Sequence, residues 1–378
     1  MGWPIVMATG GPRERGRAYG QAARDRVHGS IELYRAIFSH YTGLTWDQVR
    51  GRAGAFVEPI DALDVQLLPE MEGIAEGAAV DAEDVLALNV RTEVMYGLGA
   101  PGAAAAECTA LGLAGTRSAA GHVVVAENWD WKPRARDTCV LLVMVPPDRP
   151  GFATLVEAGL LAKSGMNEAG VGQVVNALVS SRDRGQAGAP FHAILRRTLT
   201  SRSLDEAVDA VRRPERASSA NYLLGSAEDG IADVEAAPGG PDMVTVTTGD
   251  VVVHANHFLR RDRPFKDLSL LDGQDSPDRQ RSVEEALEGS GPSEVGDVVK
   301  ALRRHAGPDR GDGSVCAHGD RTLAPEADYV TIATIALDLT AGTLELSEGN
   351  PCAAPMERFV LRDLLEAARS TSTTTLPG

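Results

Sequence analysis

The amino-acid pattern changes at a single point in this chain, and that point constrains the fold more than any other feature. Residues 97–106 read GLGAPGAAAA, a run of small residues that ends at Glu107-Cys108. Before it, apolar residues recur every three or four positions, which is typical of amphipathic helices. After it come short runs rich in β-branched residues and bounded by Gly, Pro, Asp or Asn, which are typical of strands. We therefore expect a helical segment followed by a strand-rich one.

The strand-rich part also contains helical blocks, and this mixture predicts the fold class. Runs of strands interrupted by runs of helix favour an α+β fold, in which layers of mainly antiparallel sheet carry helices on the outside. Residues 261–280 and 305–327 are polar and rich in Pro and Gly, and we expect surface loops there. The expected helical regions are 12–42, as one long helix, then 46–60, 69–79, 82–95, 191–213, 282–304 and 355–370. The expected strands are 122–131, 138–146, 152–159, 170–178, 220–227, 230–237, 242–248, 250–257, 329–338 and 343–349.

The charge of the chain limits its partners. It has 37 basic and 53 acidic residues, a formal net charge of −16. Nucleic-acid binding depends on clustered Lys and Arg that displace counterions from phosphates, and this chain has no such basic stripe. We therefore expect no nucleic-acid partner.

Cysteine use and hydropathy predict a compartment. The four cysteines show no CxxC spacing and are too few for a disulfide framework in 378 residues. The first residues lack the apolar stretch of a secretory signal, and no run of ~18 apolar residues occurs. We expect a cytoplasmic protein with free thiols and no membrane partner.

Cys108 is placed where self-cleavage would make it chemically unusual. If the peptide bond before it were cut, the thiol and a new α-amine would belong to one residue. An α-amine has a pKa near ~8 and can act as the general base for its own side chain. The cut itself can be autocatalytic, because the thiol can attack the preceding carbonyl and form a thioester that water then opens.

The residues around Cys108 resemble a known family. The segment ECTALGLAGTRSAAGHVVVAENWDW is similar to the Cys-Thr start and downstream Asn-Trp-Asp of the acyl-coenzyme A:6-aminopenicillanic acid acyltransferases, the peptidase C45 group of cysteine N-terminal-nucleophile (Ntn) hydrolases. Other segments resemble the family in the same order along the chain: GPRERGRAYGQAAR, LNVRTEVMYGL, EAGLLAKSGMNEAGVGQVVNAL and HANHFL.

This resemblance implies an architecture. It is a four-layer αββα Ntn-hydrolase sandwich with a helical N-terminal segment. Residues 1–107 would be a helical pro-segment or small subunit, and residues 108–378 the catalytic large subunit. The two self-cleaved fragments would stay associated as one compact unit.

The resemblance also implies roles for individual residues. Cys108 is the nucleophile, and cleavage after Glu107 frees its amine. Asp130 would orient and stabilise the ammonium form of that amine, and Asn256 would donate its side-chain amide to the oxyanion. Asn176 is a second candidate near the oxyanion. Trp129, together with Trp131 and Met166, is a candidate for an acyl pocket, although core packing is the default for such side chains.

Three positions depart from the family pattern. Glu107 stands where the penicillin enzyme has glycine, and a bulky anion at that position is expected to slow the cut. Ala317 replaces an arginine common in its segment. The penicillin enzyme's late active-site arginine aligns with Ala327-Asp328 here, so that contact is missing. These differences bear on the substrate more than on the reaction class.

Several outcomes remain open at this point. The expected partners are a small-molecule acyl donor, either an amide or an acyl thioester, and an acceptor that is an amine or water. An amine acceptor would make the protein an acyltransferase, and water alone would make it an N-acyl amide hydrolase. An unprocessed, non-enzymatic protein that keeps the fold as a scaffold or binding module is the third possibility.

Metal and cofactor chemistry is not expected. The strongest zinc alternative combines His254 and His257 with Cys316 and His318. Residues i and i+3 of a strand face opposite sides, so the two histidines would need a turn between them to bind one metal. Cys139 and Cys352 are interpreted as structural or incidental.

Overall fold

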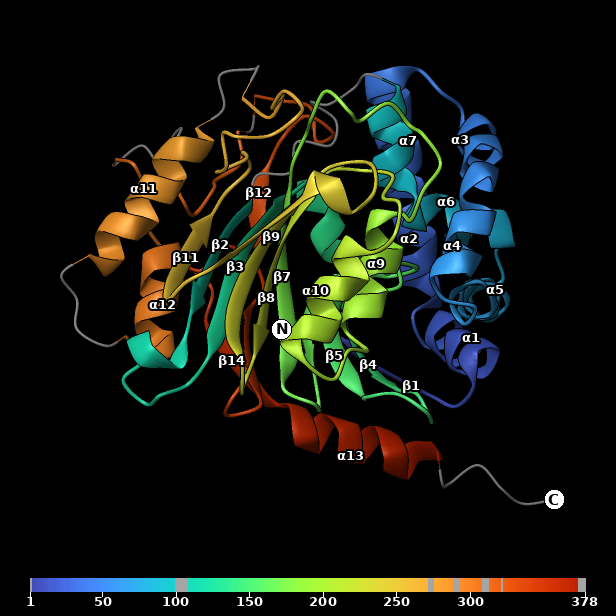
Figure 1. The fold of residues 1–378 in the computed structure, drawn as a ribbon. Coiled ribbons are helices and arrows are strands. Elements are labelled where there is room, and N and C mark those ends of the chain that lie inside the picture. The colour runs from blue at the N-terminus through green and yellow to red at the C-terminus, as the bar shows by residue number, and fades with distance from the viewer. Residues whose placement is uncertain are drawn as a thin grey trace.

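Two β-sheets stacked face to face form the centre of the protein, and helices cover both outer sides (Figure 1). The computed structural model describes residues 2–98, 108–270, 275–288, 293–307, 313–320 and 322–372. The helical and sheet layers lie in the order helix, sheet, sheet, helix. The predicted α+β fold with an αββα layer order is therefore confirmed.

The larger sheet has eight strands in the order β1-β4-β5-β6-β7-β8-β9-β10. Neighbouring strands are antiparallel except for β1 and β4, which pair in parallel from Ile5↔Leu141 to Thr9↔Val145. Its strands are β1 (Ile5–Thr9), β4 (Cys139–Val145), β5 (Phe152–Glu157), β6 (Ser164–Asn167), β7 (Val171–Ala177), β8 (Ala220–Ser226), β9 (Gly230–Ala236) and β10 (Val244–Thr248).

The smaller sheet has six antiparallel strands in the order β11-β2-β3-β12-β13-β14. Side chains on β2 and β3 alternate between the other sheet and the helices outside, as strand geometry requires. Its strands are β2 (Cys108–Leu113), β3 (Val124–Trp131), β11 (Val251–His254), β12 (Val330–Asp338), β13 (Thr343–Ser347) and β14 (Met356–Val360).

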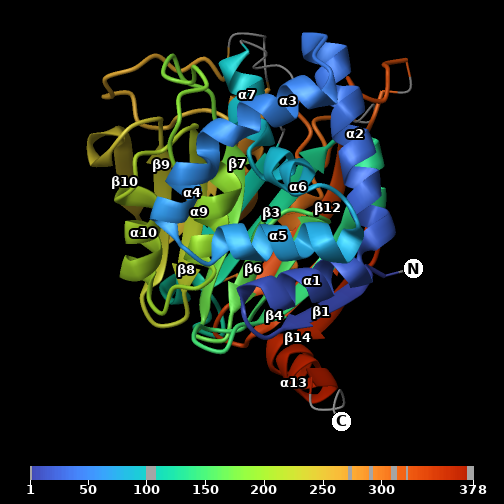
Figure 2. The ribbon, with the colours of Figure 1, turned by 90° about the vertical axis from the view of Figure 1, so that its right-hand side faces the viewer.

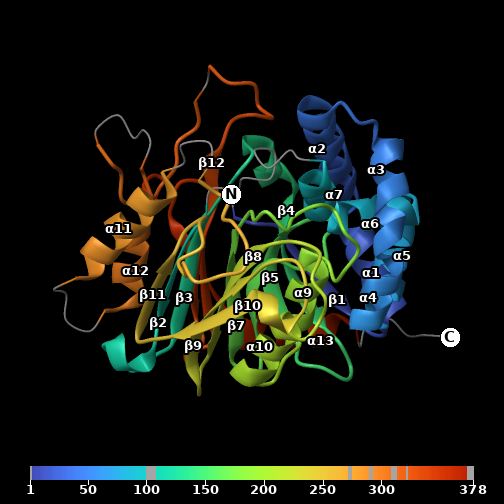
Figure 3. The same ribbon diagram turned by 45° about the horizontal axis from the view of Figure 1, so that its top comes forward.

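The two outer layers contain different parts of the chain. Helices α11 (Ser276–Leu287) and α12 (Val295–Leu302) cover the smaller sheet. Helices α9 (Phe191–Thr198) and α10 (Leu204–Arg212) cover the larger sheet together with the N-terminal helices (Figures 1 and 3). The last helix, α13 (Leu361–Ser372), packs across one end of the sheets.

The N-terminal helices form a bundle against one side of the larger sheet (Figure 2). Helices α1 and α5 approach so closely that a Cβ on Gly16 would lie 2.1 Å from the Glu70 carbonyl oxygen, so this position requires glycine. The helices are α1 (Pro12–Ala22), α2 (Arg24–Thr42), α3 (Trp46–Ala53), α4 (Val57–Leu63), α5 (Leu67–Ala78), α6 (Ala82–Asn89) and α7 (Arg91–Gly97).

Five of the expectations for individual segments were wrong in part. Residues 12–42 form two helices rather than one, with a break at Ala23. Residues 5–9 form a strand inside the segment that was expected to be helical, and residues 356–360 form a strand where a helix was expected. The expected loop at 261–280 contains the start of α11, and the expected surface loop at 305–327 contains buried residues around Val315 and Cys316.

Among the described residues, no helix combines the length and the apolar character needed to cross a membrane.

Candidate active site

Cys108 is the first residue of β2, in the middle of the smaller sheet. It pairs with Trp129 on β3, and β11 runs along the other side of β2. Its backbone N–H donates to Oδ1 of Asn256 at 2.7 Å, and its carbonyl accepts from Nη1 of Arg279 at 2.9 Å. Both polar groups of the Cys108 backbone are therefore held by side chains rather than by a neighbouring strand alone.

The pairing of β11 with β2 brings Asn256 to this position. His254 lies opposite Ala110, so a residue just beyond β11 lies beside Cys108. The Asn256 Oδ1 atom also accepts from Nη2 of Arg279 at 3.0 Å, and its Nδ2 donates to the Ala177 carbonyl at 3.1 Å. Two donors at the oxygen and a carbonyl at the nitrogen fix which way the amide points.

Arg279 is a residue that sequence reasoning missed. It lies on α11, its side chain is fully buried, and its Nε donates to Asp275 at 2.8 Å. The expectation of a loop over 261–280 placed it on the surface. The Asp-Ser-Pro sequence at 275–277 is a helix start signal and could have indicated a helix with a buried face here.

The Cys108 thiol faces a small cavity of about 40 Å³. Burial raises the pKa of this thiol to about 12, against the opposing effect of Lys163. The thiol is therefore protonated at neutral pH while the residue is held in this state. The cavity is lined by Arg91, Thr92, Met95, Tyr96, Cys108, Trp129, Trp131, Lys163, Val175, Ala177, Phe191, Ser219 and Ala220.

Trp129 and Lys163 form one wall of this cavity. The Lys163 ammonium lies 4.4 Å from the centroid of a Trp129 ring, which is a cation–π distance. Glu127 lies nearby between the sheets and accepts from the Ser164 hydroxyl at 2.5 Å and from the Val175 N–H at 2.8 Å. Lys163 was not among the predicted site residues. It is a lone lysine in an otherwise apolar stretch, LLAKSGMN, and that is the signal that could have found it.

Asp130 lies next to Trp129 on β3, with its side chain on the opposite face of the sheet. It is fully buried, and its Oδ1 accepts from the Thr331 hydroxyl at 2.5 Å. Its negative charge raises the pKa of the Cys108 thiol, whereas the hydrogen bond from its backbone N–H lowers it. Asp130 is therefore close enough to act on Cys108 electrostatically.

Asn176 lies deeper in the larger sheet. Its Nδ2 donates to the His254 carbonyl at 3.3 Å, and its Oδ1 accepts from Asn221 at 3.3 Å. Its neighbours Val175 and Ala177 line the cavity of Cys108, but Asn176 is not among the lining residues. Glu107, the other residue of the expected cleavage site, lies outside the described residues.

The histidines of the expected zinc alternative are used elsewhere. The Nε2 atom of His254 lies 3.3 Å from a carboxylate oxygen of Glu235, and Nδ1 of His257 lies 2.7 Å from the Ser276 hydroxyl. Neither belongs to the group of potential metal ligands that contains Cys316 and His318.

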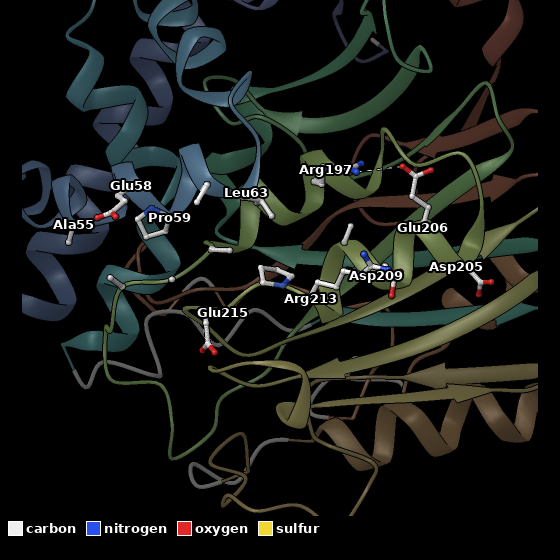
Figure 4. A pocket seen from close by; sticks show the side chains of 16 residues that line it. Ala55, Glu58, Pro59, Leu63, Arg197, Asp205, Glu206, Asp209, Arg213 and Glu215 are labelled. Atoms are coloured by element: carbon white, nitrogen blue, oxygen red, sulfur yellow. Dashed lines mark hydrogen bonds and ion pairs between the residues drawn. The ribbon is translucent and has the colours of Figure 1, made fainter.

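A larger pocket, of about 990 Å³, lies on a different part of the surface (Figure 4). It is lined by residues of α4, α9 and α10, and across it Arg197 faces Glu206 at 3.5 Å. Neither Cys108 nor Asn256 lines it, so its size does not connect it to the candidate chemistry.

Comparison with known proteins identifies the family. A sequence model of the family described as acyl-coenzyme A:6-aminopenicillanic acid acyl-transferase matches residues 117–352. The chain belongs to this family. The matched region begins after Cys108, so the geometry around that residue is an independent observation. The acyl-coenzyme A:6-aminopenicillanic-acid-acyltransferase (40 kDa form) of Emericella nidulans, a relative of this family, is 28% identical over 286 residues, covering 75% of this chain and 77% of the relative.

Two solved structures are also similar to this acyl-transferase family member. Penicillin V acylase from Agrobacterium tumefaciens is 16% identical with a TM-score of 0.37, over 64% of this chain and 83% of that one. A mutant form of the conjugated bile acid hydrolase from Clostridium perfringens is 12% identical with a TM-score of 0.41, over 67% of this chain and 96% of that one.

Proposed function

We propose that this protein is a self-processing acyltransferase or amide hydrolase in which Cys108 is the nucleophile. Cleavage before Cys108 would divide the chain into a small subunit, residues 1–107, and a catalytic subunit, residues 108–378. The observation that carries the proposal is the side-chain hydrogen bond to the backbone nitrogen of Cys108, 2.7 Å from Asn256. After cleavage this nitrogen would be the α-amine, and Asn256 would already hold it.

The cut is a two-step acyl transfer within the chain. The Cys108 sulfur attacks the carbonyl carbon of residue 107, the C–N bond breaks, and the thiol proton passes to the departing nitrogen. Water then opens the thioester, which leaves a carboxylate on residue 107 and a free thiol on Cys108. Arg279 supports this step by holding the Cys108 carbonyl and Asn256 in place at 2.9 and 3.0 Å.

The mature site would repeat this chemistry on a substrate. The α-amine takes the thiol proton, the sulfur attacks an amide or thioester carbonyl, and the leaving group departs with a proton from the ammonium. The new positive charge beside the sulfur lowers the barrier to forming the thiolate. Asp130 stabilises that ammonium. Asn256 can serve the oxyanion as well, provided that its Nδ2 exchanges the Ala177 carbonyl for the substrate oxygen.

The small size of the Cys108 cavity supports a role for chain cleavage in giving a substrate access to the thiol. A volume of about 40 Å³ holds little more than a water molecule. Part of its wall is α7, through Arg91, Met95 and Tyr96, and α7 belongs to the segment before the cut. Once the chain is cut, residues 99–107 no longer connect α7 to Cys108, which would give an acyl chain a route to the thiol while Arg91 still holds α7 to Glu157.

Formation of an acyl-enzyme tests the proposal. Mature protein is mixed with an N-acyl amide that carries a chromogenic amine, quenched in acid, and its intact mass is measured. We expect the 108–378 fragment to gain the mass of the acyl group on Cys108, and hydroxylamine to remove it. Release of the amine without any adduct, unaffected by thiol alkylation, would contradict a Cys108 thioester.

The acceptor decides between the two reaction types. Adding a free amine to the same reaction diverts the acyl group to a new amide if the protein is an acyltransferase. If the carboxylic acid stays the only product at high amine concentration, the protein is an N-acyl amide hydrolase. Protein that neither forms the adduct nor consumes substrate would favour the non-enzymatic scaffold.

A further inference from the structure

Four side chains from three separate segments of the chain meet in a cluster outside the Cys108 cavity. His305 follows α12, Cys316 and His318 precede β12, and Cys352 follows β13. Their ligand atoms all lie within 4.8 Å of one another. Cys316 is buried and the other three are partly exposed, and both cysteines are free thiols.

The distances within this cluster match the edges of a tetrahedron. The Nε2 atom of His318 lies 3.1 Å from Nε2 of His305, 3.6 Å from Sγ of Cys316 and 3.4 Å from Sγ of Cys352. Zinc–nitrogen bonds of about 2.0–2.1 Å and zinc–sulfur bonds of about 2.3 Å give tetrahedral edges of about 3.3 Å between nitrogens and about 3.6 Å between nitrogen and sulfur. The three distances from His318 therefore lie within about 0.2 Å of those edges, and all four ligand atoms lie within 4.8 Å of one another.

We propose that His305, Cys316, His318 and Cys352 bind a structural zinc ion. Two thiolates and two imidazoles in a tetrahedral arrangement are the ligand set that selects zinc. All four positions are occupied by protein side chains, which is typical of structural sites, whereas catalytic sites keep one position open for water. The sequence alternative failed because it paired Cys316 and His318 with His254 and His257 instead of with His305 and Cys352.

The surroundings of the cluster support a metal site. Asn350 donates from Nδ2 to Sγ of Cys316 at 3.4 Å and to the Ala317 carbonyl at 2.6 Å. Donors that orient ligand sulfurs are a regular feature of metal sites. The ligand segments are irregular loops, so a shared ion would connect three pieces of chain that a strand or helix does not otherwise hold.

The loop that contains Cys316 and His318 also connects to Asp130 of the candidate active site through hydrogen bonds. Ala317, between two ligands, donates its N–H to the Thr331 hydroxyl at 2.9 Å and accepts from the Thr331 N–H at 3.0 Å. That hydroxyl donates to Asp130. Asn128 also donates to the carbonyls of Leu302 and Val315, both at 2.8 Å. The zinc ion would thus position Asp130 through Ala317 and Thr331, without contacting substrate.

Metal analysis of the full chain tests the site directly. The protein is purified without added metal, and zinc is measured by mass spectrometry alongside protein concentration. We expect about one zinc ion per chain, and a loss of at least about tenfold in zinc content in Cys352→Ala and His305→Gln. Cys139→Ala is the matched control. Cys139 is also a buried cysteine, but its thiol donates a hydrogen bond to the Ala135 carbonyl, so its replacement should leave the zinc content unchanged.

Two further measurements keep the test independent of how the variants fold. Refolding wild-type protein with Co²⁺ should give the intense d–d and thiolate charge-transfer bands of a tetrahedral S₂N₂ site. Cys108→Ala should bind as much zinc as wild type, which separates this site from the proposed catalytic function. The proposal is overturned if wild-type protein takes up neither metal, if Cys352→Ala retains its zinc, or if non-reducing peptide mapping finds a Cys316–Cys352 disulfide.

Discussion

At the residue scale, the proposed chemistry depends on the atoms that surround the backbone nitrogen of Cys108. Asn256 accepts from that nitrogen, and Arg279 holds both the Asn256 oxygen and the Cys108 carbonyl. Arg279 is fully buried, and its charge is balanced by Asp275 at 2.8 Å. Burying a guanidinium is costly unless it is paired and hydrogen-bonded, and Arg279 meets this condition by bonding to Asp275, Cys108, Thr109 and Asn256, which fixes the geometry around the Cys108 nitrogen.

Two substitutions of Asn256 separate its two proposed roles. Asn256→Ala removes both the acceptor for the amine and the amide donor, so we expect slow chain cleavage and a loss of about 10²-fold or more in kcat. Asn256→Asp keeps an acceptor beside the nitrogen, so cleavage should be largely retained while kcat still falls. Wild-type kcat in both variants would exclude Asn256 from the reaction. His257→Ala, at the next position, is the control, and its kcat should fall less than that of Asn256→Ala.

The state of the Cys108 thiol should change on cleavage. In the intact chain burial raises its pKa to about 12, so the thiolate is scarce at neutral pH and alkylation should accelerate as pH rises toward that value. In the mature form the adjacent α-ammonium favours the thiolate. Iodoacetamide should therefore label Cys108 faster than Cys139, Cys316 or Cys352 in mature protein at neutral pH. Equal labelling of all four thiols would contradict a special environment at Cys108.

At the scale of elements, the N-terminal segment contributes a strand to the larger sheet and buried side chains to the contacts with the rest of the chain. Strand β1 pairs with β4 in the larger sheet. Glu70 on α5 lies between Arg15 on α1, at 2.5 Å, and Arg196 on α9, at 3.0 Å, and all three side chains are essentially unexposed. Arg91 and Tyr34 both reach Glu157 on β5, at 2.9 and 2.6 Å. These contacts support the proposal that the two fragments stay together after the cut.

Breaking the Glu70 cluster should destabilise this association. Arg196→Met removes two hydrogen bonds from Glu70 and leaves Arg15 as its partner, so we expect a loss of about 1.5–3 kcal/mol in the free energy of unfolding, measured with urea. Arg35→Ala removes an exposed pair with Glu32 and should cost less than about 1 kcal/mol. If Arg196→Met is as stable as Arg35→Ala, the cluster does not hold the layers together.

The same cluster predicts the direction of a pH effect. Burial alone would raise the pKa of Glu70, but Arg196 and Arg15 outweigh it and lower that pKa below its usual range. A carboxyl group with a lowered folded-state pKa stabilises the protein above its unfolded pKa of about 4.3, and this stabilisation is lost as pH falls through the folded value. Urea titrations between about pH 5 and pH 2, a range that brackets that pKa, test this effect. Over this range the free energy of unfolding should fall more for wild-type protein than for Glu70→Gln.

The sequence predicted most of the strands and helices, and two of the missed strands, β1 and β14, share a physical cause. Strand β1 is a short edge strand whose partner is more than 130 residues away, and the helical pattern that follows it dominates the local signal. Strand β14 runs directly into α13 and exposes Glu357 and Arg358, so it lacks the apolar alternation of a half-buried strand. Edge strands such as these are specified by their partners more than by their own residues.

Part of the candidate site could also be predicted from the sequence. Cys108, Asp130 and Asn256 were predicted as site residues because each belongs to a recognisable local motif, and the structure places Asn256 and Asp130 beside Cys108. Arg279 and Lys163 were missed because the local signals at Asp275-Ser276-Pro277 and in LLAKSGMN indicate burial at most, and contact with Cys108 depends on how α11 and the turn after β5 pack. Of the proposed zinc ligands, Cys316 and His318 were considered from the sequence, whereas His305 and Cys352 were missed because separate loops contribute them.

At the scale of the whole molecule, Cys108 contacts Arg279 of α11 and lines a cavity to which α7 and strands of both sheets contribute. The small residues at 97–106 join α7 to this point, and α7 contributes to the wall of the cavity. Family membership supports acyl transfer or hydrolysis, and the hydrogen bonds at Cys108 support the proposed cut before it. Maturation by cleavage before Cys108 is therefore the central claim.

Intact mass measurement of the purified, folded protein, together with a denaturing gel, tests that claim most directly. We predict two fragments, residues 1–107 and residues 108–378, the larger beginning Cys-Thr-Ala, which elute together in size-exclusion chromatography. Cys108→Ala should remain a single chain with the same elution volume. Folded wild-type protein that contains only the uncut chain, or a Cys108→Ala variant that is cut at the same bond, would contradict self-processing by Cys108.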